Sequence, residues 1–218
     1  MADIFDLFKQ IAKKEDTAPR AAVSWLIVGL GNPGDKYRFT RHNAGFLTLD
    51  YLAEQYGARI DRAKFHALCG EASIGTHRVL LMKPQTMMNA SGLAVQEAAA
   101  FYKIPLDHIL VISDDIAQEV GKMRVRAKGS AGGQKGLNDI ITCMGGDKFP
   151  RLRMGVGAKP HPDYDLADWV LSEFLKEDRE KLFGCFPTAK SGVEKILGGD
   201  LEGAQQICNS YAPPVKQD

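Results

Sequence analysis

The 218-residue sequence contains only four cysteines, and no two of them are spaced as C-x-x-C. Scattered cysteines are typical of proteins in a reducing compartment, where they serve as small buried side chains. This spacing argues against a framework of disulfide bonds. His66 lies three residues before Cys69. One such pair offers too few ligands to predict a zinc site.

Long hydrophobic runs are also absent. No apolar stretch approaches the roughly 18 residues needed to span a bilayer, and the N-terminus lacks the basic start and apolar core of a signal peptide. We therefore expect a cytoplasmic protein. There is no G-x-S-x-G motif, which argues against an acyl-enzyme mechanism that uses serine. Hydrophobic residues make up 44% of the chain and charged residues 25%. A chain of this composition and length can form a hydrophobic core without disulfides or bound metals.

The chain divides into one main domain and two short ends. Residues 1–22 are predicted to be an N-terminal extension, because five apolar residues at helical spacing precede a polar linker that contains Pro19. This extension is expected to pack on the body or on an unknown partner. A membrane-surface anchor is disfavoured because its polar face is not strongly basic. Residues 23–208 form the predicted domain, and residues 209–218 a loose tail.

Within residues 23–208, predicted strands and helices alternate. Buried-type strands are expected at residues 26–28 and 109–112, and helical spacing at residues 44–56 and 90–102. Residues 176–197 are also helical in pattern, but Pro187 is expected to kink or divide that helix. The alternation predicts a single α/β domain, in which a twisted, mixed, largely parallel sheet carries helices on both faces.

The first predicted strand runs into a glycine-rich turn, W-L-I-V-G-L-G-N-P-G, at residues 25–34. Gly29, Gly31 and Gly34 satisfy the pattern G-x-G-x-x-G, which is often read as a dinucleotide-binding fingerprint. In such folds the third glycine already lies in a helix, whereas here helical spacing resumes only near Ala44. The acidic residue nearest the expected ribose partner, Asp50, falls inside that helix. The turn is therefore expected to expose Asn32 at the carboxyl end of the strand.

Other polar side chains follow predicted strands or precede helices. His42 comes just before a helix, Asn89 follows a strand and a loop, and Asp114 ends a buried strand. Binding crevices of α/β sheets form at the carboxyl ends of strands. General-base activation of water can use a histidine, an aspartate that orients it and amides that hold a carbonyl, and these residue types are present here. Neutral imidazole, with an unperturbed pKa of about 6.5, can accept a proton from water near neutral pH.

Five motifs together resemble the bacterial-type peptidyl-tRNA hydrolase family, from about Trp25 to the C-terminal helices. In chain order they read G-L-G-N-P-G-x-x-Y-x-x-T-R-H-N-A-G-F, K-P-x-T-x-M-N-x-S-G, D-D, G-S-A-G-G-x-x-G-L-x-D-I and R-L-R-x-G-V-G. Any one of them is weak, but five in the family's order are specific. The first 22 residues lie outside the resemblance.

The resemblance implies an enzyme that cleaves the ester between a peptide and the 3′ ribose of tRNA, without metal or organic cofactor. It implies that His42 is the catalytic base and that Asp114 orients it. Asn32 and Asn89 match the amides that position substrate and water, and Tyr37 matches a tyrosine beside the terminal nucleotide. The expected partner is therefore peptidyl-tRNA, bound through its acceptor stem and 3′ end by a monomer.

One motif departs from the family. Many members have His-Asn in G-G-H-N-G, where this chain has Gln134 and Lys135. The asparagine contacts substrate and water in those members. Lys135 can donate hydrogen bonds but not accept them, and it carries a charge. It is expected to bind substrate by holding a carbonyl or a phosphate.

Charge is unevenly distributed. Residues 120–160 contain nine basic and two acidic side chains, although the whole chain has a net charge of only +1. We expect part of this segment to neutralise tRNA phosphates. An ordinary solvated surface is the alternative. The candidate phosphate contacts are Arg124, Arg126, Lys128, Arg151 and Arg153.

Two other readings remain open at this point. A non-catalytic RNA-binding relative would share the fold but would have no need of His42 and Asp114, and only Lys135 favours it. A dinucleotide-dependent enzyme rests only on the glycine spacing. Residues 163–169 are expected to belong to a lid over the crevice.

Overall fold

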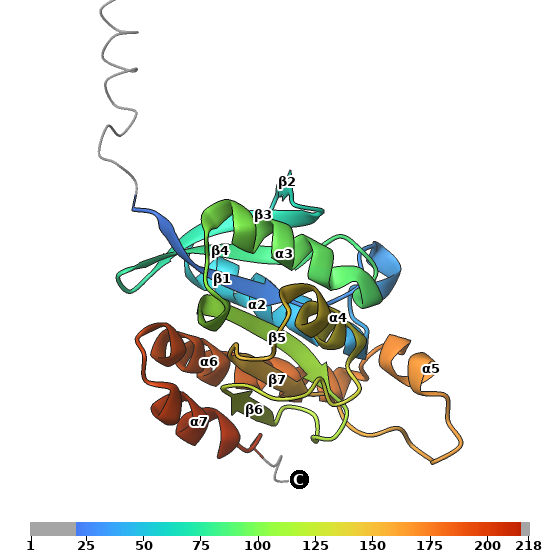
Figure 1. The fold of residues 1–218 in the computed structure, drawn as a ribbon. Coiled ribbons are helices and arrows are strands. Elements are labelled where there is room, and N and C mark those ends of the chain that lie inside the picture. Colours follow the sequence, from blue (N-terminus) through green and yellow to red (C-terminus); the bar gives the residue numbers. More distant parts are fainter. Residues whose placement is uncertain (1–20, 215–218) are drawn as a thin grey trace, which may run out of the picture.

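The computed structural model describes residues 21–214, and its strands form one mixed sheet (Figure 1). The predicted helix of the N-terminal extension lies outside the described residues. Within them the sheet has seven strands in the order β2-β3-β4-β1-β5-β7-β6. The strands are β1 (Val23–Gly29), β2 (Arg62–Lys64), β3 (Ala67–Ile74), β4 (His77–Pro84), β5 (Ile109–Asp115), β6 (Met123–Arg126) and β7 (Arg151–Gly155).

The central strands β4, β1, β5 and β7 are parallel to one another, and the outer strands β2, β3 and β6 run antiparallel to their neighbours. Every residue of β5 is buried, as expected for a parallel strand that is covered on both faces. The predicted α/β fold, with a mixed sheet that is parallel at its centre, is confirmed.

Helices cover both faces of the sheet (Figure 1). Alternate residues of β1 point to opposite sides, so Ile27 belongs to the core cluster that includes α2, α6 and α7, while Val28 belongs to the cluster that includes α3 and α4. The helices are α2 (Ala44–Gln55), α3 (Ser91–Tyr102), α4 (Lys135–Met144), α5 (Leu166–Leu171), α6 (Lys176–Leu197) and α7 (Leu201–Asn209), with short 3₁₀ turns η1 (Asp35–Tyr37), η2 (Arg41–Asn43), η3 (Met88–Ala90) and η4 (Leu106–His108).

Pro187 does not divide the helix in which it lies. α6 runs without a break from Lys176 to Leu197. Pro187 is on the exposed side of the helix, where water can satisfy the Phe183 carbonyl that proline cannot reach. The buried stripe that includes Leu182, Phe186 and Val193 packs on the sheet and holds the helix together.

The glycines of the first motif serve close packing. A Cβ atom on Gly29 would lie 2.5 Å from the Gly45 carbonyl oxygen, and one on Gly45 would lie 2.3 Å from the carbonyl oxygen of Ile112 in β5. These contacts let the start of α2 press directly on β1 and β5. As expected from the sequence, the turn does not lead directly into a helix, because η1 and η2 separate it from α2, so the arrangement of a dinucleotide fingerprint is not present here.

The cysteines behave as predicted from their spacing. All four are unpaired, and Cys69, Cys185 and Cys208 are buried. Burial raises the pKa of the Cys69 and Cys208 thiols to about 11 and that of Cys185 to about 12, so these thiols stay protonated and unreactive near neutral pH. No helix within residues 21–214 has both the length and the apolar character to cross a bilayer.

Candidate active site

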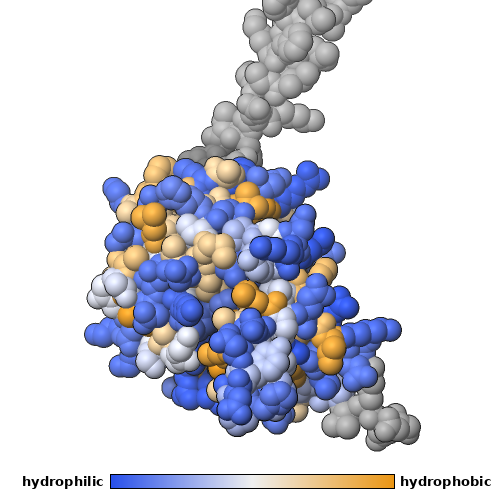
Figure 2. Space-filling model, turned by 90° about the vertical axis from the view of Figure 1, so that its right-hand side faces the viewer, coloured by the Kyte–Doolittle hydropathy of each residue, from blue (hydrophilic) through white to orange (hydrophobic). Residues whose placement is uncertain are grey.

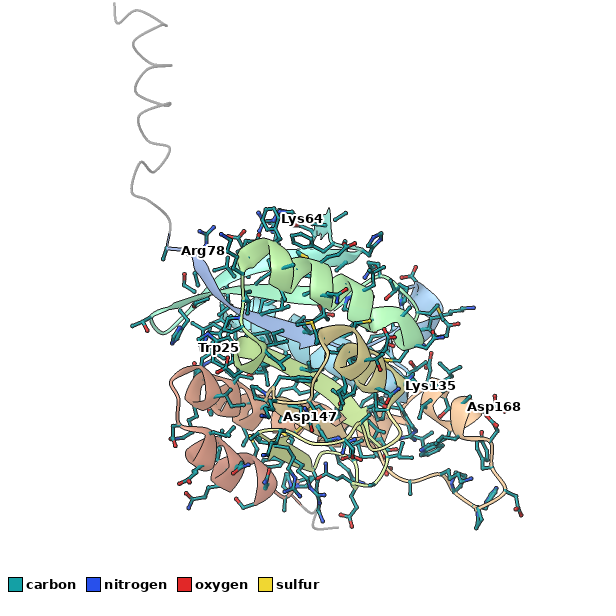
Figure 3. All side chains as sticks on the ribbon, in the orientation of Figure 1. Trp25, Lys64, Arg78, Lys135, Asp147 and Asp168 are labelled. Carbon is teal, nitrogen blue, oxygen red and sulfur yellow. The ribbon has the colours of Figure 1, made fainter. Side chains whose placement is uncertain are left out.

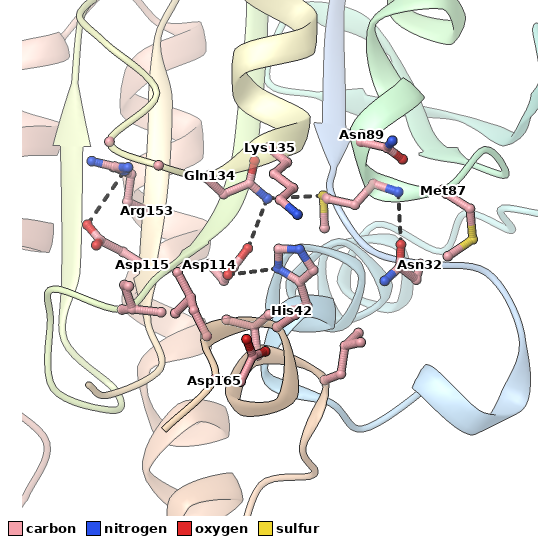
Figure 4. Close-up of a pocket in the computed structure, with 18 residues that line it drawn as sticks. Asn32, His42, Met87, Asn89, Asp114, Asp115, Gln134, Lys135, Arg153 and Asp165 are labelled. Atoms are coloured by element: carbon pink, nitrogen blue, oxygen red, sulfur yellow. Dashed lines mark hydrogen bonds and ion pairs between the residues drawn. The ribbon is translucent and has the colours of Figure 1, made fainter. Parts of the chain in front are cut away.

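A crevice of about 480 Å³ opens at the carboxyl ends of β1 and β5. Its polar wall comes from the segments that follow these strands and β4, and from the start of α4 (Figure 4). The carboxyl ends of parallel strands meet at one edge of a sheet, which is why residues far apart in sequence converge here. The structure brings together five residues that were predicted as catalytic or substrate-binding, namely Asn32, His42, Asn89, Asp114 and Lys135.

His42 and Asp114 form a buried pair. The His42 Nδ1 atom lies 2.9 Å from Asp114 Oδ2, and the two residues are 8% and 3% exposed. A carboxylate can only accept hydrogen bonds, so Nδ1 carries the proton and donates. The other ring nitrogen, Nε2, therefore keeps its lone pair, and it is the nitrogen that can receive a proton from a molecule in the crevice.

The orientation of Asn32 is fixed by two neighbours. Its Oδ1 atom accepts a hydrogen bond of 2.8 Å from the Met88 backbone N–H. The Asn43 side chain accepts from the backbone N–H of Asn32 and donates to its carbonyl. Because its oxygen is directed at the Met88 N–H, Asn32 turns its amino group the other way, and Figure 4 shows that nitrogen on the side of His42.

The other predicted substrate-binding residues are held less firmly. Asn89, on η3, is exposed and lines the crevice, and no described residue holds its carboxamide. Lys135 is the exposed first residue of α4 and also lines the crevice. Tyr37 lies half-buried on η1 and is not part of the lining, so the structure does not bring it together with the other predicted residues.

The opposite wall of the crevice is largely apolar. Leu166, Val170 and Leu171 of α5 line it, and Met87 after β4 and Ile116 after β5 add apolar surface elsewhere in the crevice. The segment expected to form a lid, residues 163–169, overlaps α5, and three of its residues, Asp165, Leu166 and Ala167, line the crevice. Seen from this side of the molecule, the surface is mostly hydrophilic with small hydrophobic patches among the polar residues (Figure 2).

A partner of Asp114 was not predicted. The Oδ1 atom of Asp114, which His42 does not use, accepts a hydrogen bond of 3.0 Å from Gln134 Nε2. Gln134 is the N-cap of α4, and its Oε1 atom accepts from the Leu137 backbone N–H at 2.6 Å. In the sequence Gln134 stood out only as a departure from the family pattern.

Comparison with known proteins decides the family. Residues 26–217 match the model of the family described as peptidyl-tRNA hydrolase. The chain belongs to the peptidyl-tRNA hydrolase family. It is 46% identical over 187 residues to a peptidyl-tRNA hydrolase of Caldicellulosiruptor bescii, covering 86% of this chain and 97% of that one. It is 47% identical over 184 residues to one of Clostridium perfringens, covering 84% and 96%.

A solved structure agrees with this assignment. The crystal structure of peptidyl-tRNA hydrolase from Acinetobacter baumannii matches with a TM-score of 0.83 and 35% identity, covering 90% of this chain and 100% of that chain. The resemblance inferred from the five motifs is thereby confirmed for the family and the fold.

The basic segment of this peptidyl-tRNA hydrolase family member is only partly available to RNA. Arg124 and Arg126 of β6 and Lys128 after it are exposed. Arg153 is half-buried and lines the crevice. Its guanidinium donates to the Ala131 carbonyl at 2.7 Å and pairs with the Asp115 carboxylate at 3.5 Å.

Figure 3 shows Lys135 and Asp168 on the side of the molecule where the parallel strands have their carboxyl ends, and Arg78 on the opposite side.

Arg151 is a correction to the predicted phosphate contacts. It is 1% exposed, and its guanidinium donates to the backbone carbonyls of Gly129, Asp147 and Phe149. It lies opposite Arg126 in the sheet, but the segment between β6 and β7 covers it. Burial lowers the pKa of the Arg151 guanidinium. Arg151 therefore holds a loop in place and cannot contact a phosphate.

We predict that Arg151→Met destabilises the fold by about 3 kcal/mol, because three backbone carbonyls, of which that of Phe149 is buried, lose their donor. Chemical denaturation measures this change, with Arg126→Ala as the exposed control, which should stay within about 0.5 kcal/mol of wild type. Equal stability of the Arg151→Met protein would show that the guanidinium does not hold the loop.

Proposed function

We propose the following mechanism for peptidyl-tRNA hydrolysis, the activity that family membership gives this chain. His42 is the general base, Asp114 orients it, and the ester between peptide and 3′ ribose lies in the crevice between them and α5. The observation that carries the proposal is the 2.9 Å bond between His42 Nδ1 and Asp114 Oδ2. It leaves Nε2 as the base, beside the amino group of Asn32.

The proposed reaction has two steps. Nε2 of His42 takes a proton from a water molecule, whose oxygen attacks the ester carbonyl and forms a tetrahedral oxyanion. The bond to the ribose 3′ oxygen then breaks, and the imidazolium returns its proton to that oxygen. Asp114 stabilises the imidazolium while it exists. An ester needs little activation of its leaving group, so one base and one water suffice.

Asn32 is the proposed donor to the oxyanion. Its oxygen is occupied by Met88 N–H, so it presents N–H groups, and a buried donor of this kind contributes about 3 kcal/mol in other hydrolases. Asn89 is exposed and can present either end of its carboxamide. We assign to Asn89 the positioning of water or substrate.

The tRNA is proposed to enter along β6. The exposed side chains of Arg124, Arg126 and Lys128 would neutralise phosphates of the acceptor stem, and Arg153 and Lys135 would meet the 3′ end at the crevice. Such contacts bind phosphate and sugar groups and do not depend on base sequence, which suits an enzyme that must accept many tRNAs. Tyr37 keeps its proposed place beside the terminal nucleotide only by resemblance, since it does not line the crevice.

The non-catalytic alternative is not supported. The relatives are named as peptidyl-tRNA hydrolases, and the intact His42–Asp114 pair has no use in a protein that only binds RNA. Residues 23–208 are proposed as the catalytic domain, with residues 1–22 as an extension for an unknown partner and residues 209–218 as a tail. All proposed catalytic groups come from one chain, which supports a monomer, and the tRNA substrate and unpaired cysteines support the cytoplasm.

His42→Ala should lower kcat by about 10³-fold, because the base that activates water is lost, while tRNA binding persists. The measurement is release of N-acetyl-amino acid from N-acetyl-aminoacyl-tRNA, with unblocked aminoacyl-tRNA as the poor-substrate control. His66→Ala is the matched variant, because His66 is exposed and pairs with Glu97. Wild-type turnover by the His42→Ala protein would remove His42 from the mechanism.

Replacing both Arg124 and Arg126 by alanine should raise KM and leave kcat nearly unchanged. Each lost phosphate contact should reduce the slope of log KM against log salt by roughly 0.7 to 0.9. Arg62→Ala is the control, because Arg62 is exposed on β2 at the opposite edge of the sheet. A salt slope equal to that of wild type in the double variant would mean that β6 does not contact RNA.

A further inference from the structure

Gln134 occupies an unusual position between a helix start and the catalytic pair. It is 6% exposed, and both ends of its carboxamide are engaged. Oε1 accepts the Leu137 backbone N–H at 2.6 Å, and Nε2 donates to Asp114 Oδ1 at 3.0 Å. The Nε2 atom also lies 3.0 Å from the Met88 sulfur. The two ends of the side chain therefore serve two different partners.

The hydrogen bonds form a directed chain. The Leu137 N–H donates to Gln134. Gln134 in turn donates to Asp114, and His42 donates to the other oxygen of Asp114 (Figure 4). Because the cap fixes Oε1, the amide must point its nitrogen at Asp114. Because that nitrogen holds Oδ1, the carboxylate must turn Oδ2 toward His42. The first turn of α4 thus sets the rotation of the catalytic carboxylate.

We propose that Gln134 is a positioning residue for catalysis, which holds the Asp114 carboxylate in the orientation that His42 requires. The proposal rests on the mechanism given above. Gln134 has no titratable proton, unlike the histidine that many family members carry here, so this support does not vary with pH. An N-cap with only a structural role would stabilise α4 and leave turnover unchanged.

A single substitution separates the two roles. Glutamate has the shape of glutamine and can still accept the Leu137 N–H, so Gln134→Glu keeps the cap. When it is ionised, the introduced carboxylate cannot donate to Asp114 and repels it, whereas its protonated form can donate as glutamine does. Two adjacent carboxylates share one proton and release it at a raised pH. The other ionisable groups that line the crevice with His42 are Asp115, Lys135, Arg153 and Asp165, and they are common to both proteins.

The expected result is a change in the pH profile of kcat. Between pH 6 and 8.5, Gln134→Glu should lose turnover as the shared proton leaves, reaching about 10- to 100-fold below wild type, with KM nearly unchanged. Wild type should show no such loss. Gln134→Met should be impaired at every pH, and Gln134→His should recover turnover to within about threefold of wild type, because imidazole can both accept and donate.

The control is Asn138→Asp, which adds the same charge to α4 one turn further on, at an exposed residue, where water screens it. Its profile should parallel that of wild type. Thermal unfolding of each variant shows whether the fold is intact. A Gln134→Glu profile that runs parallel to wild type would overturn the proposal. Absence of hydrolysis in wild type would instead overturn the mechanism on which it rests.

Discussion

The proposed chemistry depends on one hydrogen bond, between Nδ1 of His42 and Oδ2 of Asp114, whose side chains are both buried. A buried carboxylate is stable only if donors satisfy it, and here His42 supplies one and Gln134 the other. The same bond decides which ring nitrogen is basic. Stability of the buried charge and readiness for proton transfer thus come from the same contacts.

The fold makes this bond possible by bringing two distant segments together. His42 lies on η2, just before α2, and Asp114 ends β5. They meet because Gly29 and Gly45 let the start of α2 approach the sheet more closely than any side chain would allow. A methyl group at Gly45 would collide with the backbone of Leu30 and of Ile112. The close approach at Gly29 and Gly45 therefore helps to place His42 beside Asp114.

Much of this arrangement could be predicted from sequence, because strand ends and helix starts can be located from hydrophobic spacing and parallel strands end at one edge. That reasoning placed Asn32, His42 and Asp114 in one crevice. It could not reveal contacts that depend on side-chain direction. Arg151 and Arg153 both alternate with apolar residues in the sequence of β7. In the structure, Arg151 is completely covered by a loop, whereas Arg153 is only half-buried. The sequence shows only that Gln134 replaces a histidine of the family pattern, and its hydrogen bonds to Asp114 and Leu137 depend on the side-chain direction that the structure supplies.

The most direct test of the proposed mechanism is the tautomer of His42, measured by ¹⁵N nuclear magnetic resonance of the histidine-labelled protein at the pH at which hydrolysis is assayed. If His42 is the base, Nδ1 carries the proton and Nε2 shows the chemical shift of an unprotonated nitrogen. In Asp114→Asn the preference should weaken or reverse. A proton on Nε2 of His42 in the wild-type protein would contradict the account, because the base would then have no lone pair to offer the crevice.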